Sequence, residues 1–156
     1  MLVPFSLLLN LASVSAAEEK SQLWGFIQRY APEASPESNP GMDAAVAHAL
    51  RYYADFVKPA KVYRMPDALE REALEDLRDQ LRAYDGPVED EALQSIVYGC
   101  GRERFDPLRA WFGALYEVLL GASQGPRFGG FIALYGVAET ADLIDAALAG
   151  EFVTAD

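Results

Sequence analysis

The sequence predicts an all-α protein, a compact bundle of about seven or eight helices. Apolar residues recur at helical spacing along most of the chain, no segment alternates like a half-buried strand, and short stretches rich in proline or glycine separate the helical segments. Of the 156 residues, 51% are hydrophobic. This content supports a folded core and excludes a disordered tail.

The first part of the chain is predicted to hold three helices. Two apolar or amphipathic helices cover 4–14 and 17–30. The stretch 31–41 contains three prolines, two serines and a glycine, so we expect a loop there. A third helix spans 42–57 and stops before Pro59, because the residue preceding a proline is pushed out of the helical region.

Asp67 and Glu70 mark the start of the next helix, since their spacing is that of a capping box. The helix ends at Asp85-Gly86-Pro87. One narrow apolar stripe of this helix is expected to pack against the core, and the other faces are charged. The stripe consists of Leu69, Ala73, Leu77, Leu81 and Tyr84.

Three further helical regions complete the bundle. The first has a buried face that includes Cys100, because apolar residues recur at i, i+3, i+4 and i+7 at Leu93, Ile96, Val97 and Cys100. Asp106 as cap and Pro107 at the first helical position predict a central helix over 107–120. The segments 127–136 and 139–149 form a last helical pair.

The whole chain, 1–156, is predicted to be one domain. It has no internal repeat and no linker long enough to divide it, and any division into two lobes would fall near 58–66. The apolar run at 2–12 resembles part of a secretion signal, but no Lys or Arg precedes it and it is too short to cross a bilayer, which takes roughly 20 residues. We therefore expect a buried helix there and no membrane partner.

The net charge of -11 argues against a protein that simply coats nucleic acid. The acid is concentrated in 67–91, which has ten acidic residues against three arginines. By contrast, 58–66 is basic, and 92–131 holds four arginines against three acids. Aromatic residues accompany both segments, and cations with rings suit the phosphates and unstacked bases of single-stranded nucleic acid. The alternative is that these charged segments are ordinary solvent-exposed surface without a nucleic-acid partner.

No catalytic or metal site is predicted. One histidine, His48, and one cysteine, Cys100, cannot form a conventional zinc site. His48 is expected to be a packed or surface residue, and Cys100 an inert core thiol. The acids of 67–91 are expected to be surface charge. The turn 125–130 either cradles a phosphate, with Arg127 as clamp, or is a tight interhelical turn in which glycines permit close packing.

Four segments carry a resemblance to a known family. They are PFSLLLNLASVS (4–15), LWGFIQRYAP (23–32), YYADFVKPAKVYRMPD (52–67) and GASQGPRFGGFIALYG (121–136). In order and spacing across 3–152, they resemble the C-terminal part of class I lysyl-tRNA synthetases. At Gly130 the family more often has serine.

In that family, an N-terminal Rossmann domain activates lysine with ATP through His-Ile-Gly-His-type and Lys-Met-Ser-Lys-type motifs. Neither motif occurs here. The resemblance therefore implies that the catalytic domain is absent, as in a shortened chain or a split-gene product, that this chain alone is not an enzyme, and that it binds no cofactor. ATP and lysine would bind the missing domain.

The C-terminal part of the family is an α-helical cage that recognises the anticodon end of lysine tRNA. The resemblance thus implies a cytoplasmic, tRNA-binding module whose partners are the tRNA(Lys) anticodon stem-loop and the catalytic domain of the same synthetase. The alternative is a freestanding helical protein-interaction module derived from that domain, whose acidic face binds a protein. A third, weaker candidate is an enzyme with an unrecognised carboxylate site.

The resemblance favours the two basic segments as the tRNA-binding region, and the individual roles are hypotheses. Lys58, Lys61 and Arg64, with Tyr63 beside them, are expected on backbone phosphates. Arg127 with Phe128 is expected at the loop itself. Second-rank candidates are Arg102 and Arg104. The two tryptophans, Trp24 and Trp111, are expected in the core.

Overall fold

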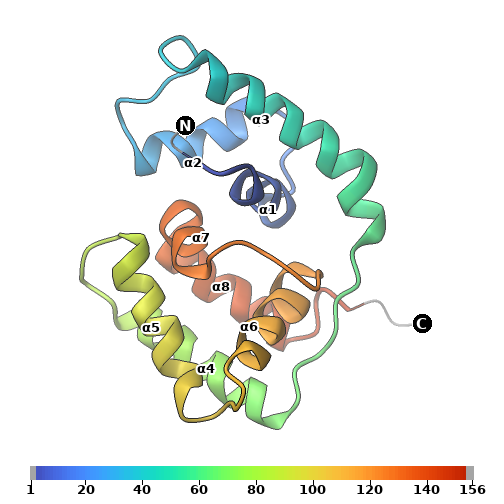
Figure 1. Ribbon diagram of the computed structural model, residues 1–156, viewed down its shortest axis with the longest axis vertical. Helices are drawn as coiled ribbons and strands as arrows, with labels where there is room; N and C mark the ends of the chain where they lie inside the picture. The colour runs from blue at the N-terminus through green and yellow to red at the C-terminus, as the bar shows by residue number, and fades with distance from the viewer. Residues whose placement is uncertain (1–2, 154–156) are drawn as a thin grey trace. The chain divides into compact units, whose positions relative to one another are not determined.

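A computed structural model describes residues 3–153 and confirms the all-α prediction (Figure 1). Within this range there is no strand, and the eight α-helices are α1 (Phe5–Ser15), α2 (Lys20–Tyr30), α3 (Pro40–Tyr52), α4 (Ala68–Ala83), α5 (Asp90–Arg102), α6 (Arg109–Leu115), α7 (Phe128–Tyr135) and α8 (Val137–Leu148). Leu2, in the predicted apolar run, and residues 154–156 of the acidic tail lie outside the described residues.

Three short segments extend or follow these helices. Two are π-helical, η1 (Tyr53–Val57) after α3 and η3 (Tyr116–Leu120) after α6, and the third is the 3₁₀ turn η2 (Lys58–Ala60). None of the helices within 3–153 is both long and apolar enough to cross a membrane.

The chain divides into two compact units, unit 1 (1–61) and unit 2 (62–156). The division falls within the stretch 58–66, where the basic segment lies. Each unit has its own buried apolar residues.

Unit 1 is built from α1, α2 and α3, with both α1 and α2 packed against α3. Its α1 is the buried core helix that the sequence predicts, with Leu8 and Leu11 in the core. Trp24 is buried as expected, and its Nε1 donates to Oδ1 of Asp43 over 2.9 Å. The same carboxylate accepts from Lys20 at 3.0 Å, and these two bonds lower the pKa of Asp43.

Unit 2 holds α4 to α8, and its most extensive contacts are between α5 and α7 and between α4 and α8. Trp111 is completely buried, as expected, and its Nε1 donates to the carbonyl oxygen of Val97 over 2.8 Å. A buried indole N–H without such an acceptor would be costly, so this bond fixes α6 against α5.

The capping box at the start of α4 is confirmed. The Asp67 side chain accepts from the backbone N–H of Glu70, and the Glu70 carboxylate accepts from the N–H of Asp67. The predicted apolar stripe is partly wrong, because Leu69 is exposed and Leu74 is fully buried. The face turned to the core instead comprises Glu70, Ala73, Leu74, Leu77 and Leu81.

The start of α6 also differs from the prediction. The helix begins at Arg109, so Pro107 is not the first helical residue. The bond between Asp106 and Pro107 is cis. Just before this bond, the Phe105 ring packs on Trp111 at a centroid distance of 5.4 Å. The segment between α5 and α6 thus makes a tertiary contact, where the local sequence signals predict that the helix begins directly at Pro107.

Gly129 allows α7 to lie directly against α5. A Cβ at this position would meet the carbonyl oxygen of Asp90 and lie 2.6 Å from the backbone nitrogen of Gln94. Both obstacles belong to the backbone of α5 and cannot swing aside. Gly129 is therefore required for close helix packing.

We predict that Gly129→Ala destabilises the protein by about 1–3 kcal/mol, because the added methyl forces α7 away from α5. The matched control is Gly113→Ala in α6, where a Cβ would meet nothing within 4 Å. That change should leave stability unchanged or raise it by up to about 1 kcal/mol, through better helix propensity. Urea unfolding of both variants measures the difference, and equal stability would contradict the packing role of Gly129.

Candidate nucleic-acid interface

The eight predicted tRNA-binding residues are divided between the two units. Lys58 and Lys61 lie in unit 1, and the other six lie in unit 2. Within unit 2 the six have four different environments: the core, internal ion pairs, a half-buried ring contact and an open pocket. The environment decides the role, because only accessible groups can meet a ligand.

Phe128 lies in the core, so the prediction that it contacts RNA is corrected. Its ring is 0% exposed and packs on Phe131 at a centroid distance of 5.2 Å. It is the first residue of α7, a helix that is apolar on nearly every side, so the sequence does not reveal which side faces inward. The structure uses this ring for packing.

Arg64 is held by two carboxylates of its own unit. Its Nη1 and Nη2 donate to the two oxygens of Glu70 at 2.7 and 2.9 Å, and its Nε donates to Glu117 at 2.6 Å. Glu70 is buried, and the Arg64 guanidinium lowers its pKa. Because Glu70 also caps α4, Arg64 ties the segment before α4 to both α4 and η3. An RNA phosphate would have to displace these carboxylates.

Arg104 has a similar structural role at the end of α5. Its Nη1 donates to Asp76 and to the carbonyl oxygen of Cys100, both at 2.9 Å, and its Nε donates to Glu72 at 3.3 Å. It therefore links α5 to α4. Burial raises the pKa of the Cys100 thiol to about 12, so the thiol is protonated at neutral pH, consistent with the inert cysteine that the sequence predicts.

Lys61 and Tyr63, which lie on either side of the unit boundary, are half-buried. In unit 2, the Tyr63 ring packs beside Phe152 at a centroid distance of 5.3 Å and lies against Gly121, which has a left-handed backbone with φ of 65°. In unit 1, burial lowers the pKa of Lys61 to about 8. Lys61 thus carries its full charge only below about pH 7.

Arg102 and Arg127 come together at an open pocket of about 430 Å³ on the α5–α7 side of unit 2. Tyr98, which is 45% exposed, also lines the pocket, together with Glu91, Gln94, Ser95 and Gly99. Arg127 Nε donates to Asp90 at 2.8 Å. Arg102 is exposed and has no ion-pair partner in the described part of the chain. We call this site the α5–α7 pocket.

Tyr98 was missed by the sequence analysis, although a signal exists. Tyr98 and Arg102 are four residues apart on α5, opposite the face that buries Leu93, Val97 and Cys100. A ring and a cation on one outward face of a helix form a candidate contact surface.

The α5–α7 pocket also bears on the glycine-rich turn. The backbone N–H of Gly129 donates to Gln94 Oε1 at 2.7 Å, so this N–H is already occupied. Together with the close approach at Gly129, this supports the tight interhelical turn over the phosphate cradle.

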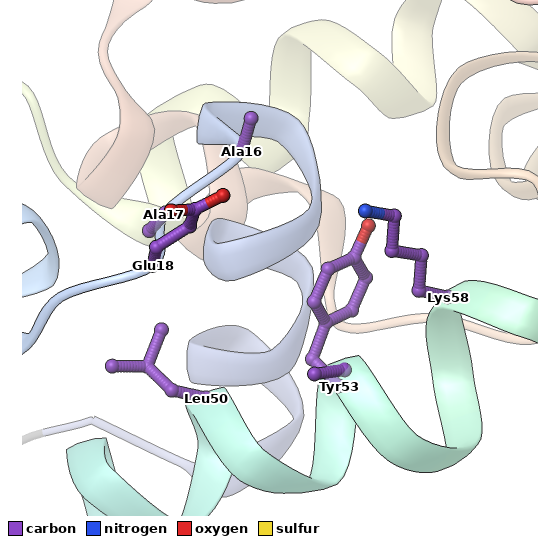
Figure 2. Close-up of a pocket in the computed structure, with 7 residues that line it drawn as sticks. Ala16, Ala17, Glu18, Leu50, Tyr53 and Lys58 are labelled. Carbon is purple, nitrogen blue, oxygen red and sulfur yellow. The ribbon is translucent and has the colours of Figure 1, made fainter.

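A second pocket, of about 360 Å³, lies within unit 1 (Figure 2). Lys58 and Tyr53 reach toward the same hollow from η2 and η1, and Glu18 and Leu50 contribute other parts of its lining. Lys58 is exposed, and no ion pair of its ammonium occurs within residues 3–153. Among those residues, no group of His, Cys, Asp and Glu could hold a metal ion.

Comparison with known proteins relates this chain to tRNA ligases. All 156 residues align at 81% identity with a lysine–tRNA ligase of Roseobacter denitrificans, and the aligned region covers 30% of that protein. The chain is homologous to one region of bacterial lysine–tRNA ligases. Identity to the lysine–tRNA ligase of Rickettsia conorii is 44% over 147 residues, covering 94% of the chain and 28% of the relative.

The lysine–tRNA ligase of Rickettsia bellii gives 44% identity over 144 residues, covering 92% of the chain and 28% of the relative. The chain thus spans about three tenths of the length of these relatives. No family model matches it, and no solved structure matches it significantly. The relationship to lysine–tRNA ligases that the sequence motifs indicate is confirmed at this level.

We predict that Glu70→Gln lowers the free energy of unfolding at pH 7 by about 1–3 kcal/mol, because it removes a charge-assisted pair and weakens the cap of α4. The pKa of Glu70 is lowered in the folded state from 4.5. Its ion pair therefore stabilises the fold above about pH 4.5, and this contribution is lost as the pH falls through the folded pKa.

Stability should consequently fall less steeply in Glu70→Gln than in the parent protein between about pH 5 and pH 3. The control is Glu75→Gln, which removes an exposed carboxylate 3.8 Å from Arg71 on the same helix. Its effect should stay within about 0.5 kcal/mol. Chemical unfolding across this pH range measures both variants, and parallel pH profiles for Glu70→Gln and the parent would contradict the role of this pair.

Proposed function

We propose that the chain is the anticodon-binding region of a class I lysine–tRNA ligase and contributes tRNA(Lys) recognition to aminoacylation. The observation that carries the proposal is the 81% identity with a lysine–tRNA ligase over the full chain. The four segments that resemble class I lysyl-tRNA synthetases support the assignment to class I and to the C-terminal, anticodon-binding region. The all-helical fold agrees with the helical cage that the resemblance implies.

Catalysis, with the ATP and lysine sites, belongs in this proposal to the remainder of the ligase, which is also a partner of this region. The described side chains support that assignment. His48 is packed against the ring of Phe5, and Cys100 is a buried, protonated thiol. A buried, protonated thiol is a poor nucleophile, and the exposed His48 imidazole has no carboxylate partner within residues 3–153.

The α5–α7 pocket is the contact site that we propose in unit 2. Arg102 is available for a phosphate, Tyr98 for a splayed base, and Arg127 for either after it releases Asp90. The neighbouring Asp90 and Glu91 repel phosphates and limit the number that can bind. Such a pocket suits a few specific contacts with a loop and disfavours nonspecific coating of a duplex.

The alternative, a protein-interaction module with an acidic face, has less support from the structure. On α4 and α8, Arg78 pairs with Asp79 and Asp145, and Arg82 pairs with Asp142 and Asp145. These carboxylates are thus partly neutralised within unit 2, and they leave a weaker acidic surface than the sequence suggests.

We predict that the chain binds a tRNA(Lys) anticodon stem-loop in fluorescence anisotropy, with an affinity that decreases steeply with salt. The log–log slope should be about -0.7 to -0.9 for each phosphate contacted. Arg102→Ala should reduce the magnitude of that slope by about 0.7 to 0.9, the contribution of one phosphate contact. Arg109→Ala is the matched control, because Arg109 is exposed, has no ion pair in the described residues and does not line the pocket.

A stem-loop with a changed anticodon should bind at least about tenfold more weakly, which corresponds to about 1.4 kcal/mol. Equal affinity for the two stem-loops would contradict anticodon recognition. Equal log–log slopes for Arg102→Ala and the parent would contradict the proposal that the α5–α7 pocket contacts tRNA.

We also predict that the chain alone does not support lysine-dependent exchange of pyrophosphate into ATP, because the activation motifs are missing from it. The assay uses labelled pyrophosphate, with a complete lysine–tRNA ligase as the positive control. Lysine-dependent exchange by the purified chain would overturn the assignment of catalysis to the remainder of the ligase.

A further inference from the structure

The charge of the protein is distributed unequally between its two units. Unit 1 has five Lys and Arg residues against six Asp and Glu, whereas unit 2 has eight against eighteen. Nearly all of the net charge of -11 thus belongs to unit 2. A polyanion can approach unit 1 without strong long-range repulsion from that unit's own charges.

Four neighbouring rings form a cluster at the surface of unit 1, which we call the aromatic ladder: Phe5, His48, Tyr52 and Phe56. The His48 and Phe5 rings stack at a centroid distance of 5.1 Å, and Tyr52 lies 6.1 Å from each of them. Phe56 follows at 5.2 Å from Tyr52. The last three rings are spaced four residues apart along α3 and η1, so they follow one side of the helix.

The outer rings of the ladder are open to solvent. Phe56 is 65% exposed, Tyr52 is 40% exposed, and they are inclined at 47° to each other. Single exposed apolar residues need no explanation, but a contiguous exposed cluster indicates a binding surface.

The kind of residue exposed distinguishes the two units. In the described part of unit 1, residues 3–61, the exposed large hydrophobic residues are all aromatic: Tyr30, Tyr52 and Phe56. In the described part of unit 2 they are mostly aliphatic, and Tyr98 is the exception. A surface of exposed rings suits flat nucleobases, whose faces stack on aromatic side chains whatever the base.

Two cations lie next to the ladder in sequence. Arg51 precedes Tyr52, Lys58 follows Phe56 by two residues, and both are exposed. Within residues 3–153 neither forms an ion pair, in contrast to Arg64 and Arg104 of unit 2. Lys58 also reaches into the unit 1 pocket beside Tyr53 (Figure 2). Asp55 is the acidic residue of this segment.

We propose that the aromatic ladder is a stacking platform for unpaired RNA bases, with Arg51 and Lys58 contacting phosphates of the same strand. The proposal rests on the proposed function, because the unpaired bases would be those of the anticodon loop. It deepens that function by adding a second contact surface, in unit 1, that uses rings more than charge. The exposed rings, the two unpaired cations and the near-neutral charge of unit 1 favour RNA over a protein as the occupant.

The test compares Phe56→Ala and Tyr52→Ala with the parent chain in anisotropy titrations against two probes, the tRNA(Lys) anticodon stem-loop and an unstructured oligouridine hexamer. Loss of one stacked base should weaken binding of both probes at least about fivefold. Phe56→Trp, which keeps a ring, should bind as well as the parent or better. Tyr30→Ala is the matched control, because Tyr30 is a 45% exposed ring of unit 1 outside the ladder.

Salt dependence separates the roles of rings and cations. Arg51→Gln and Lys58→Gln should each reduce the magnitude of the log–log slope for the hexamer by about 0.7. The ring variants should lower affinity at every salt concentration and leave the slope unchanged. Phe56 is mostly exposed, so its replacement should not unfold the protein, which thermal unfolding of each variant verifies.

The outcomes distinguish the ladder from the proposed function. If the parent binds the stem-loop and Phe56→Ala binds both probes equally well, the ladder proposal is overturned and the proposed function stands. If the parent binds only the hexamer, in a ladder-dependent way, the ladder proposal stands and anticodon binding fails. If the parent binds neither probe, both proposals are overturned, and the ladder is then better explained as a protein contact.

Discussion

An excess of carboxylates determines which cations of unit 2 are available. Unit 2 has eighteen acidic residues and eight arginines. Within the described residues, six of these arginines pair with carboxylates, and Arg102 and Arg109 do not. These pairs hold helices together, as Arg64 does for α4 and η3. An arginine is therefore a poor indicator of RNA contact here unless its partners are known.

This constraint explains which parts of the sequence analysis succeed. Features set by residues close in sequence are predicted well. The capping box of Asp67 and Glu70, the buried face of α5 with Cys100 and the existence of each helix all depend on spacings of three or four residues. Element boundaries are predicted less well where a tertiary contact intervenes, as between Phe105 and Trp111 before α6.

The candidate site could be predicted only in part. Arg64 and Glu117 are 53 residues apart in the chain, and Arg104 and Asp76 are 28 apart, so no local pattern reveals their pairing. The burial of Phe128 depends on which side of an all-apolar helix faces α5. Arg102 and Arg127 were predicted for the same function and do line one pocket. The aromatic ladder had a signal that was overlooked, since His48, Tyr52 and Phe56 recur at four-residue spacing.

The two units thus offer different chemistry toward RNA. Unit 1 has little net charge, exposed rings and, within residues 3–153, two cations without ion pairs. The described part of unit 2 is acidic, its helices are joined by ion pairs, and it holds the arginine-lined α5–α7 pocket.

The most direct test is amide NMR of the 17.1 kDa chain titrated with a tRNA(Lys) anticodon stem-loop. Shifts should concentrate on 48–58 and on the α5–α7 pocket. Shifts concentrated on α4 and α8, or no shifts at all, would contradict the account.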